Sequence, residues 1–214
     1  MQFFDGCVFS YPAGQVSISR YAVELHALGF SGFVVSGSDT GLSVTSPVQV
    51  WYARYLEMIS TKHLAREVGR PAADNELVYV SAGDSGYNRT VLSTNGVNAL
   101  VDLENTQKDC FDRYCAKLAA DRNIAVGISI KPLIELRGVP RQKVIRKYEE
   151  ILTLQRRYEF PLIFSSHASD ILRLRSPRAI SLLIQSIWDD EELTARALTT
   201  IPALKESNSP VREV

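Results

Sequence analysis

The sequence predicts a TIM-barrel-like fold, a parallel (β/α) barrel of the α/β class, and two observations support this prediction. Seven short apolar segments alternate with amphipathic helical segments along the chain, which is typical of a parallel sheet covered by helices. Polar residues follow the apolar segments, where a parallel barrel carries its functional face. An open doubly wound sheet is the alternative, although neither a Gly-x-Gly-x-x-Gly motif after a strand nor a Gly-Lys-Ser/Thr phosphate loop is present.

The composition is that of an ordinary globular protein. Hydrophobic residues make up 45% of the 214 residues and charged residues 22%. Neither a long uncharged apolar run nor a signal peptide is recognisable, so we expect a soluble cytoplasmic protein without a membrane segment. We expect residues 1–205 to form a single barrel domain and residues 206–214 a flexible C-terminal tail. The cysteines lack Cys-x-x-Cys spacing and are expected to be free thiols: Cys7, Cys110 and Cys115.

The first third of the chain begins with a strand and a helix. Apolar residues in 2–9 predict the strand, and apolar residues spaced three and four apart in 16–28 predict an amphipathic helix. A second strand is expected at 32–35. The following segments are predicted as a loop or broken helix at 39–46, a third strand beginning in 48–59 of which 52–58 could equally be helical, and a helix at 61–68.

The middle third repeats the strand and helix plan. Strands are expected at 76–81 and 97–103, joined by a short helix at 87–93 and a turn at Asn95-Gly96. A covering helix is predicted at 107–122, with Asn105 or Thr106 as its N-cap. The apolar run 124–130 predicts a buried strand that ends at Lys131.

The last third begins with a long predicted helix at 139–158. A short strand at 161–164 follows, and then Ser176 as N-cap and Pro177 as first helical residue start a helix through Trp188. A last helix is expected at 191–198, with acidic residues in its first turn.

Charge is distributed unevenly along the chain, although the net charge is zero. Residues 131–178 contain eleven Lys and Arg against five Asp and Glu, a local charge of +6 that leaves −6 for the remainder. Such a block indicates a partner that is a polyanion. Alternatively, these basic residues simply lie on well-solvated helix faces and bind no partner.

The segment 161–178 is the strongest candidate for binding an anion. Its strand opens on Ser165, Ser166 and His167, and three arginines follow around the next helix start. Backbone N–H groups at a helix N-terminus and arginines beside them suit phosphate oxygens. The alternative is that Ser165 and Ser176 are N-caps and that the arginines are solvated.

An enzymatic site is the second hypothesis for the strand ends. They supply three carboxylates, one lysine and one histidine, a set that could serve metal or acid–base chemistry: Asp84, Asp102, Glu104, Lys131 and His167. Metal-dependent phosphoesterases require several converging ligands, whereas the other histidines, His26 and His63, fall on predicted helices, and no Gly-x-Ser-x-Gly elbow exists. We therefore predict no catalytic residue and no metal ligand set, while a residual metal site at Asp84 and Asp102 stays open.

Residues 124–202 resemble a known family. A strand ending in Ser-Ser, the phrase Leu174-Arg175-Ser176-Pro177, an apolar helix and a second helix ending near Pro202 are similar to protein component three of archaeal and eukaryotic ribonuclease P, and so is the preceding segment KPLIELRGVPRQKVIRKYEEILTLQRRYEFPLIFSS. Before residue 124 the resemblance rests on the order of strands. The family more often has Gly at the position of His167, and Gly rather than Asp near 189.

This resemblance implies a barrel like that of the histidinol-phosphatase superfamily, without most of its metal ligands. It also implies that a catalytic RNA, using Mg²⁺, removes the 5′ leader from precursor tRNA, while the protein binds no cofactor itself. The implied partners are the ribonuclease P RNA, precursor tRNA through the holoenzyme, and a second small protein subunit in a heterodimer or heterotetramer. A metal-dependent phosphoesterase acting on a small phosphorylated substrate is the alternative function.

The predicted RNA contacts lie in the basic segment and at the adjoining strand end. Basic side chains there can neutralise backbone phosphates without precisely placed catalytic groups. We also expect Asp84, Asp102, Lys131 and Ser166 to lie at one rim of the barrel. The predicted RNA-binding residues are Lys131, Arg137, Arg141, Lys143, Arg146, His167, Arg173, Arg175 and Arg178.

Overall fold

The computed structural model describes residues 1–37, 45–57 and 59–208, and most of the predicted loop at 39–46 lies outside them. Within these residues one seven-stranded sheet follows the order of the chain, and every neighbouring pair of strands is parallel. The strands are β1 (Phe4–Phe9), β2 (Gly32–Ser36), β3 (Gln49–Leu56), β4 (Glu76–Ser81), β5 (Ala99–Val101), β6 (Ala125–Ser129) and β7 (Leu162–Ser165).

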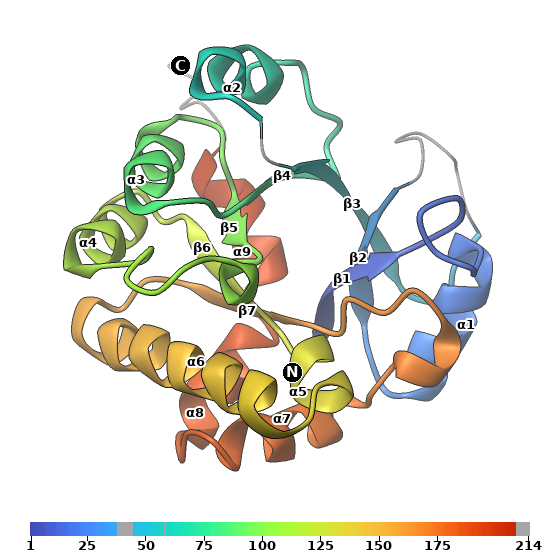
Figure 1. Cartoon of the computed structure of the whole chain (residues 1–214). Coiled ribbons are helices and arrows are strands. Elements are labelled where there is room, and N and C mark those ends of the chain that lie inside the picture. Colours follow the sequence, from blue (N-terminus) through green and yellow to red (C-terminus); the bar gives the residue numbers. More distant parts are fainter. Residues whose placement is uncertain (38–44, 58, 209–214) are drawn as a thin grey trace.

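The two outer strands of the sheet, β1 and β7, meet and nearly close it into a barrel (Figure 1). Val8 forms a parallel bridge with Ala168, just after β7, and the Phe9 N–H donates to the Ala168 carbonyl at 2.9 Å. Gly6 permits this approach, because an added Cβ would lie 2.6 Å from the Phe164 carbonyl oxygen. The predicted TIM-barrel-like class is therefore confirmed.

Helices cover the outside of the barrel (Figure 1). None of them, in the part of the chain that the structure describes, is long and apolar enough to cross a membrane. They are α1 (Ile18–Ala27), α2 (Thr61–Val68), α3 (Ser85–Ser93), α4 (Arg113–Asp121), α5 (Lys131–Glu135), α6 (Gly138–Tyr158), α7 (Pro177–Gln185), α8 (Glu191–Ala197) and α9 (Ile201–Asn208), with 3₁₀ turns η1 (Leu103–Asn105) and η2 (Ile171–Arg173).

The hydrophobic core has two layers, one on each face of the sheet. Side chains such as Val34, Leu77 and Tyr79 fill the barrel interior, whereas Phe33 and Val80 pack between the strands and the helices. Both faces of the strands are therefore apolar, which explains why these strands read as continuous hydrophobic runs instead of alternating patterns.

A helix that the sequence analysis missed, α9, follows α8. The expectation that 191–198 is the last helix is wrong, and α9 extends past the predicted start of the tail at residue 206. Ile201 and Leu204 are each 1% exposed and pack into the interior core layer. The Asn98 side chain also donates to the Leu204 carbonyl at 3.2 Å. Because Asn98 precedes β5, α9 lies against the amino-terminal end of the barrel.

Four predicted boundaries change. Tyr52–Leu56 pairs with Glu76–Val80, so β3 is a strand to Leu56 and the helical alternative is rejected. Strand β5 ends at Val101 because Asp102 adopts φ 61°, outside the strand region. The helix expected at 107–122 begins only at Arg113, where the Asp112 side chain accepts the Cys115 N–H and caps it. Helix α7, capped by Ser176 as predicted, ends at Gln185 instead of Trp188.

Candidate functional site

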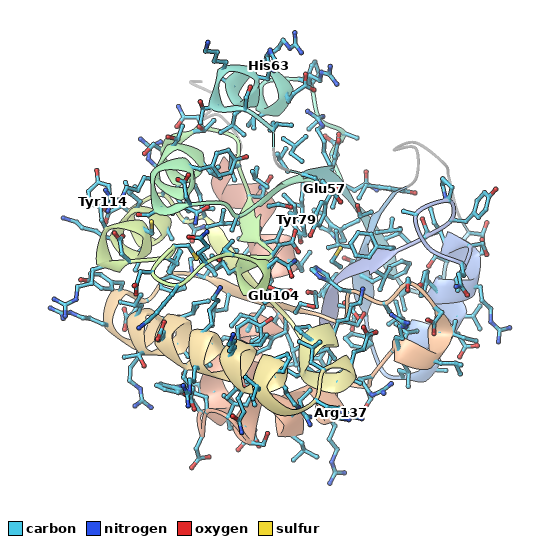
Figure 2. The ribbon with its side chains drawn as sticks, in the orientation of Figure 1. Glu57, His63, Tyr79, Glu104, Tyr114 and Arg137 are labelled. Carbon is cyan, nitrogen blue, oxygen red and sulfur yellow. The ribbon has the colours of Figure 1, made fainter. Side chains whose placement is uncertain are left out.

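Four predicted residues follow the carboxyl ends of adjacent strands. Asp84, Asp102, Lys131 and Ser166 come after β4, β5, β6 and β7, respectively. Because all neighbouring strands are parallel, these residues lie at one rim of the barrel, as predicted. His26 and His63 lie on the outer helices α1 and α2, also as predicted, and Figure 2 shows His63 at the periphery, away from the central Glu104.

A cavity of about 340 Å³ opens at this rim. Carboxylates outnumber cations in its lining, since Lys131 is the one Lys or Arg among the described residues that line it. Glu135 forms an ion pair with Arg173 at 2.5 Å, which leaves three other carboxylates facing one ammonium group. The lining consists of Phe9, Tyr55, Glu57, Asp102, Glu104, Asn105, Lys131, Pro132, Glu135, Leu136 and His167. We call this space the rim cavity.

Three potential metal ligands converge in the rim cavity. One ligand atom each from Asp102, Glu104 and His167 lies within 4.8 Å of the others. The Asp102 carboxylate is oriented through its Oδ2, which accepts hydrogen bonds from the Tyr55 hydroxyl at 2.7 Å and the Ser81 hydroxyl at 2.6 Å. Its other oxygen, Oδ1, lies 4.0 Å from His167 Nδ1.

His167 is held at the rim by its backbone and by aromatic neighbours. Its φ of 47° lies in the left-handed region, and its ring stands edge-on to Phe9 and Tyr55 with centroids 5.5 and 6.4 Å away. The residue is 6% exposed. Burial, together with the charge of Lys131, lowers the pKa of His167 to about 4, although Asp102 opposes the shift. The imidazole is therefore neutral at pH 7.

Glu104 brings a partly unsatisfied carboxylate to the same place. Its Oε2 is buried and has no hydrogen-bond partner among the described residues. Burial raises the pKa of Glu104 to about 7, and the charge of Asp102 adds to the shift, while Tyr148 and Lys147 oppose it. The Glu104 carboxyl group is therefore about half protonated at pH 7 and contributes only part of a negative charge.

The backbone N–H groups after β7 do not form the predicted anion cradle. Ser166 N–H donates to Asp5 Oδ1 at 2.9 Å, His167 N–H to the Cys7 carbonyl at 2.9 Å, and Ala168 N–H to Ser166 Oγ at 3.2 Å. These donors stabilise the junction of β7 with β1 instead. The anion-binding interpretation of this strand end is wrong for that reason.

The three arginines after β7 have different surroundings. Arg173 pairs with both Glu135 and Asp170. Arg175 donates to the Leu172 and Leu174 carbonyls, at 2.9 and 2.7 Å. Arg178 is exposed and has no ion-pair or hydrogen-bond partner within the described part of the chain. Only Arg178 therefore presents an uncommitted guanidinium to solvent.

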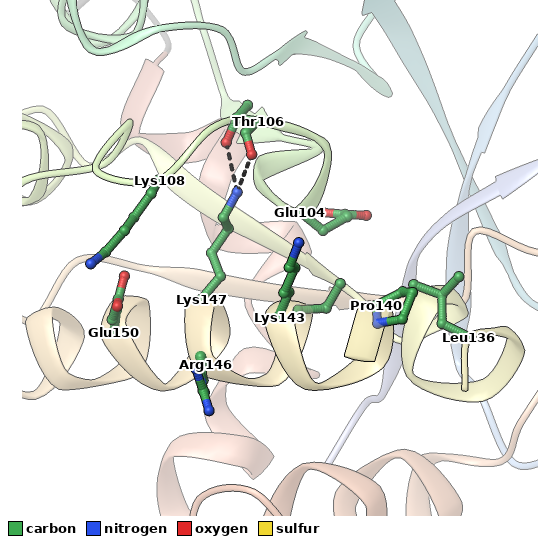
Figure 3. A pocket seen from close by; sticks show the side chains of 10 residues that line it. Glu104, Thr106, Lys108, Leu136, Pro140, Lys143, Arg146, Lys147 and Glu150 are labelled. Carbon is green, nitrogen blue, oxygen red and sulfur yellow. Dashed lines mark hydrogen bonds between the residues drawn. The ribbon is translucent and has the colours of Figure 1, made fainter. Parts of the chain in front are cut away.

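A second cavity, of about 600 Å³, lies between α6 and the loop at 103–108, and we call it the α6 groove (Figure 3). Lys147 crosses it and donates to the Leu103 carbonyl at 2.9 Å and to the Thr106 carbonyl, so Lys147 fixes the loop. Lys108 and Lys143 point into the space, whereas Arg146 points away from the loop (Figure 3). Glu104 and Leu136 line both cavities.

The predicted RNA-binding residues thus fall into separate places. Lys143 and Arg146 are exposed along the α6 groove, whereas Lys131 and His167 belong to the acidic rim cavity. Arg137 donates to two nearby carbonyls, and Arg141 is half-buried on α6. Sequence reasoning missed Lys108, because it was assigned to a helix that does not form there.

Comparison with known proteins identifies relatives over nearly the whole chain. Ribonuclease P protein component 3 of Methanosarcina mazei is 26% identical over 208 residues, which cover 94% of this chain and 87% of that protein. The protein of the same name from Methanothermobacter thermautotrophicus is 29% identical over 143 residues, covering 66% of this chain and 58% of that protein.

Solved structures share the fold. A chain in the cryo-EM structure of archaeal ribonuclease P with mature tRNA matches with a TM-score of 0.79 at 17% identity, covering 95% of this chain and 90% of that chain. Histidinol phosphate phosphatase from Lactococcus lactis, crystallised with zinc, L-histidinol and phosphate, matches with a TM-score of 0.58 at 10% identity, covering 87% and 94%.

The family match extends well before residue 124, where the sequence resemblance becomes specific. A family model described as RNase P subunit p30 matches residues 2–204. The chain therefore belongs to the RNase P subunit p30 family.

Proposed function

We propose that this chain is an RNA-binding protein subunit of ribonuclease P, which supports the catalytic RNA in removing the 5′ leader from precursor tRNA. The family match over residues 2–204 carries this proposal. Two further observations support it: curated relatives have the name ribonuclease P protein component 3, and an archaeal ribonuclease P contains a chain of the same fold. The Mg²⁺ of the cleavage step belongs to the RNA in this proposal.

The α6 groove is the proposed RNA-binding surface. Lys108, Lys143 and Arg146 are exposed and have no ion-pair partner among the described residues, so their charges can neutralise phosphates. The exposed Arg178 is a further candidate. The rim cavity is a poorer place for RNA, because its carboxylates repel phosphates.

Reconstitution with the RNA and the remaining protein subunits tests this surface. The double variant Lys143→Ala/Arg146→Ala should lower leader cleavage at limiting Mg²⁺ roughly tenfold or more, since each lost phosphate contact weakens assembly. The matched control is Lys62→Ala/Arg66→Ala, which removes the same charge from exposed positions of α2. Equal activity of the two double variants would reject the α6 groove, and full activity of a mixture lacking the chain would reject the proposed function.

We further propose that the isolated chain is not catalytic. Its three convergent ligands include a single imidazole, and the acidic rim cavity disfavours a phosphorylated substrate. A phosphodiesterase assay with Mn²⁺ or Zn²⁺ should therefore show no turnover above background. Metal-dependent turnover that disappears in Asp84→Ala or His167→Ala would favour the phosphoesterase alternative.

We also propose that this chain binds a second, smaller protein subunit directly. The two subunits would form a heterodimer, and two heterodimers can associate into a heterotetramer. Large apolar side chains suited to a protein interface are exposed at Val139, Leu172 and Leu182, which are 64%, 84% and 58% exposed. Light scattering of the purified pair should give the mass of one or two copies of each subunit. Two unassociated proteins in that measurement would contradict the pairing.

A further inference from the structure

We propose that Asp102, Glu104 and His167 form a binding site for a divalent transition-metal ion, Zn²⁺ or Mn²⁺, in the rim cavity. The inference is independent of the proposed role in ribonuclease P. It differs from the expectation that the protein itself binds no metal, and it replaces the pair Asp84 and Asp102 that the sequence left open.

The first support is the convergence of donors from distant parts of the chain. Asp102 and Glu104 follow β5, His167 follows β7, and their nearest ligand atoms lie within 4.8 Å of one another. Zinc ligands about 2.0–2.1 Å from a tetrahedral ion are separated by roughly 3.3 Å. Binding therefore requires the ligand atoms to close by up to about 1.5 Å, and the 4.0 Å between Asp102 Oδ1 and His167 Nδ1 to shorten by about 0.7 Å, through side-chain rotation.

The second support is a buried polar atom without a partner. Glu104 Oε2 is buried and has no hydrogen-bond partner among the described residues. A buried polar atom without a partner is costly, and a metal ion would satisfy it. His167, which is 6% exposed, lies beside this carboxyl group with Nδ1 4.0 Å from Asp102 Oδ1.

The donor types favour a transition metal. The neutral imidazole suits Zn²⁺, the two carboxyl groups suit Mn²⁺ as well, and Mg²⁺ and Ca²⁺ prefer all-oxygen sites. Tyr55 and Ser81 donate to Asp102 Oδ2 and leave Oδ1 free, an arrangement by which outer groups orient a metal ligand. Coordination positions that the three residues leave open would face the rim cavity.

The charge of the cavity also favours a cation. Glu57, Asp102 and Glu104 face Lys131, while Glu135 is already paired with Arg173. The excess of negative charge attracts a dication more strongly than Lys131 repels it. Asp84 stays outside the site because its side chain caps α3, accepting the Tyr87 N–H at 2.8 Å.

Calorimetric titration of Zn²⁺ into the tag-free, full-length protein tests the site. Wild type should bind one equivalent, and Glu104→Gln and His167→Asn should each weaken binding at least tenfold. Asn is chosen at 167 because it tolerates positive φ. Asp84→Asn, which keeps the cap, is the matched control and should bind like wild type. It retains all three cysteines, so adventitious thiol binding would appear equally in every variant.

Thermal unfolding distinguishes a lost site from a lost fold. At a free Zn²⁺ concentration 100-fold above Kd, the ratio of folded to unfolded wild type should rise about 100-fold. Glu104→Gln should unfold at the same temperature as wild type, or higher, without metal, and its gain from Zn²⁺ should be at least about tenfold smaller than that of wild type. Absence of saturable binding in wild type, an equal response of Glu104→Gln, or Mg²⁺ binding as tight as Zn²⁺ would overturn the proposal.

Discussion

At the scale of single residues, positive backbone angles mark both sides of the rim cavity. Asp102 and His167 adopt φ values of 61° and 47°, which are uncommon for residues other than glycine. The resemblance to ribonuclease P proteins implies Gly more often than His at position 167. The left-handed backbone gives this preference a physical reason. In this chain the position instead carries an imidazole, directed at Asp102.

The single buried residue Asp5 provides a test of how the stability of the protein depends on pH. It is fully buried on β1, its Oδ1 accepts the Ser166 and Cys7 N–H groups, and its Oδ2 has no hydrogen-bond partner in the described residues. Burial raises the pKa of Asp5 to about 6, although those hydrogen bonds oppose the shift. The folded state thus binds this proton more tightly than the unfolded state, so the contribution of Asp5 to stability falls as pH rises from about 4 to 6.

Asp5→Asn should therefore stabilise the protein at pH 7.5, by about 2–3 kcal/mol if its Oδ1 keeps both hydrogen bonds. The gain should vanish near pH 4, where Asp5 is protonated in the folded protein. Urea unfolding at the two pH values measures the difference, with the exposed Asp74→Asn as control for the loss of one charge. A variant less stable than wild type at pH 7.5 would show that the carboxylate itself is required.

At the scale of elements, the strands were easier to predict than their connections. β2, β4 and β6 are short, mainly apolar runs, and β1 is such a run broken by Asp5 and Gly6, so local pattern suffices to find them. α5 and α9 are short, and their stability comes from packing against the barrel, which spacing does not reveal. Lys147 illustrates the same limit at the site: its position on α6 was predicted correctly, but the loop that it contacts comes from another part of the chain.

The residues at the rim of the barrel could be predicted from the sequence, but the contacts between them could not. Carboxylates after strand ends follow from the order of elements, and Asp102, Glu104 and His167 could all be named in advance. The hydrogen bonds from Tyr55 and Ser81 could not, because they depend on the register of β3 and β4 against β5. Parallel register is set by packing between distant segments rather than by local sequence.

α9 yields a prediction at this scale. Ile201 is buried at the amino-terminal end of the barrel, so Ile201→Ala should reduce the free energy of unfolding by about 2–3 kcal/mol. Ala203→Ser changes an exposed position of the same helix and should stay within about 0.5 kcal/mol of wild type. Urea denaturation of both variants measures these values. An effect of Ile201→Ala as small as that of Ala203→Ser would mean that α9 does not stabilise the barrel.

At the scale of the whole molecule, charge is sorted between two adjoining spaces. The α6 groove has four basic and two acidic side chains in its lining, whereas carboxylates predominate in the rim cavity. The net charge of zero does not reveal this separation of basic and acidic side chains. RNA lying along the groove would thus be confined on one side by repulsion from the rim.

The salt dependence of RNA binding should show which Lys and Arg side chains contact RNA phosphates. Arg173 and Arg175 already have partners, so the triple variant Arg173→Ala/Arg175→Ala/Arg178→Ala should flatten the log–log slope of affinity against salt by about one unit, from Arg178 alone. The double variant Lys143→Ala/Arg146→Ala should flatten it by about two. Fluorescence anisotropy across a salt series measures both slopes. A larger change in the triple variant would place the RNA over the segment after β7.

Lys147 links the α6 groove to the rim cavity as well as holding the loop at 103–108. By anchoring the carbonyls of Leu103 and Thr106, it fixes the backbone on both sides of Glu104, a residue that lines the groove and the rim cavity alike. A dication beside Glu104 would make the electrostatic potential of the groove more positive and so strengthen its hold on a phosphate. Thermodynamic reciprocity then requires that RNA strengthen the hold on the dication by the same factor.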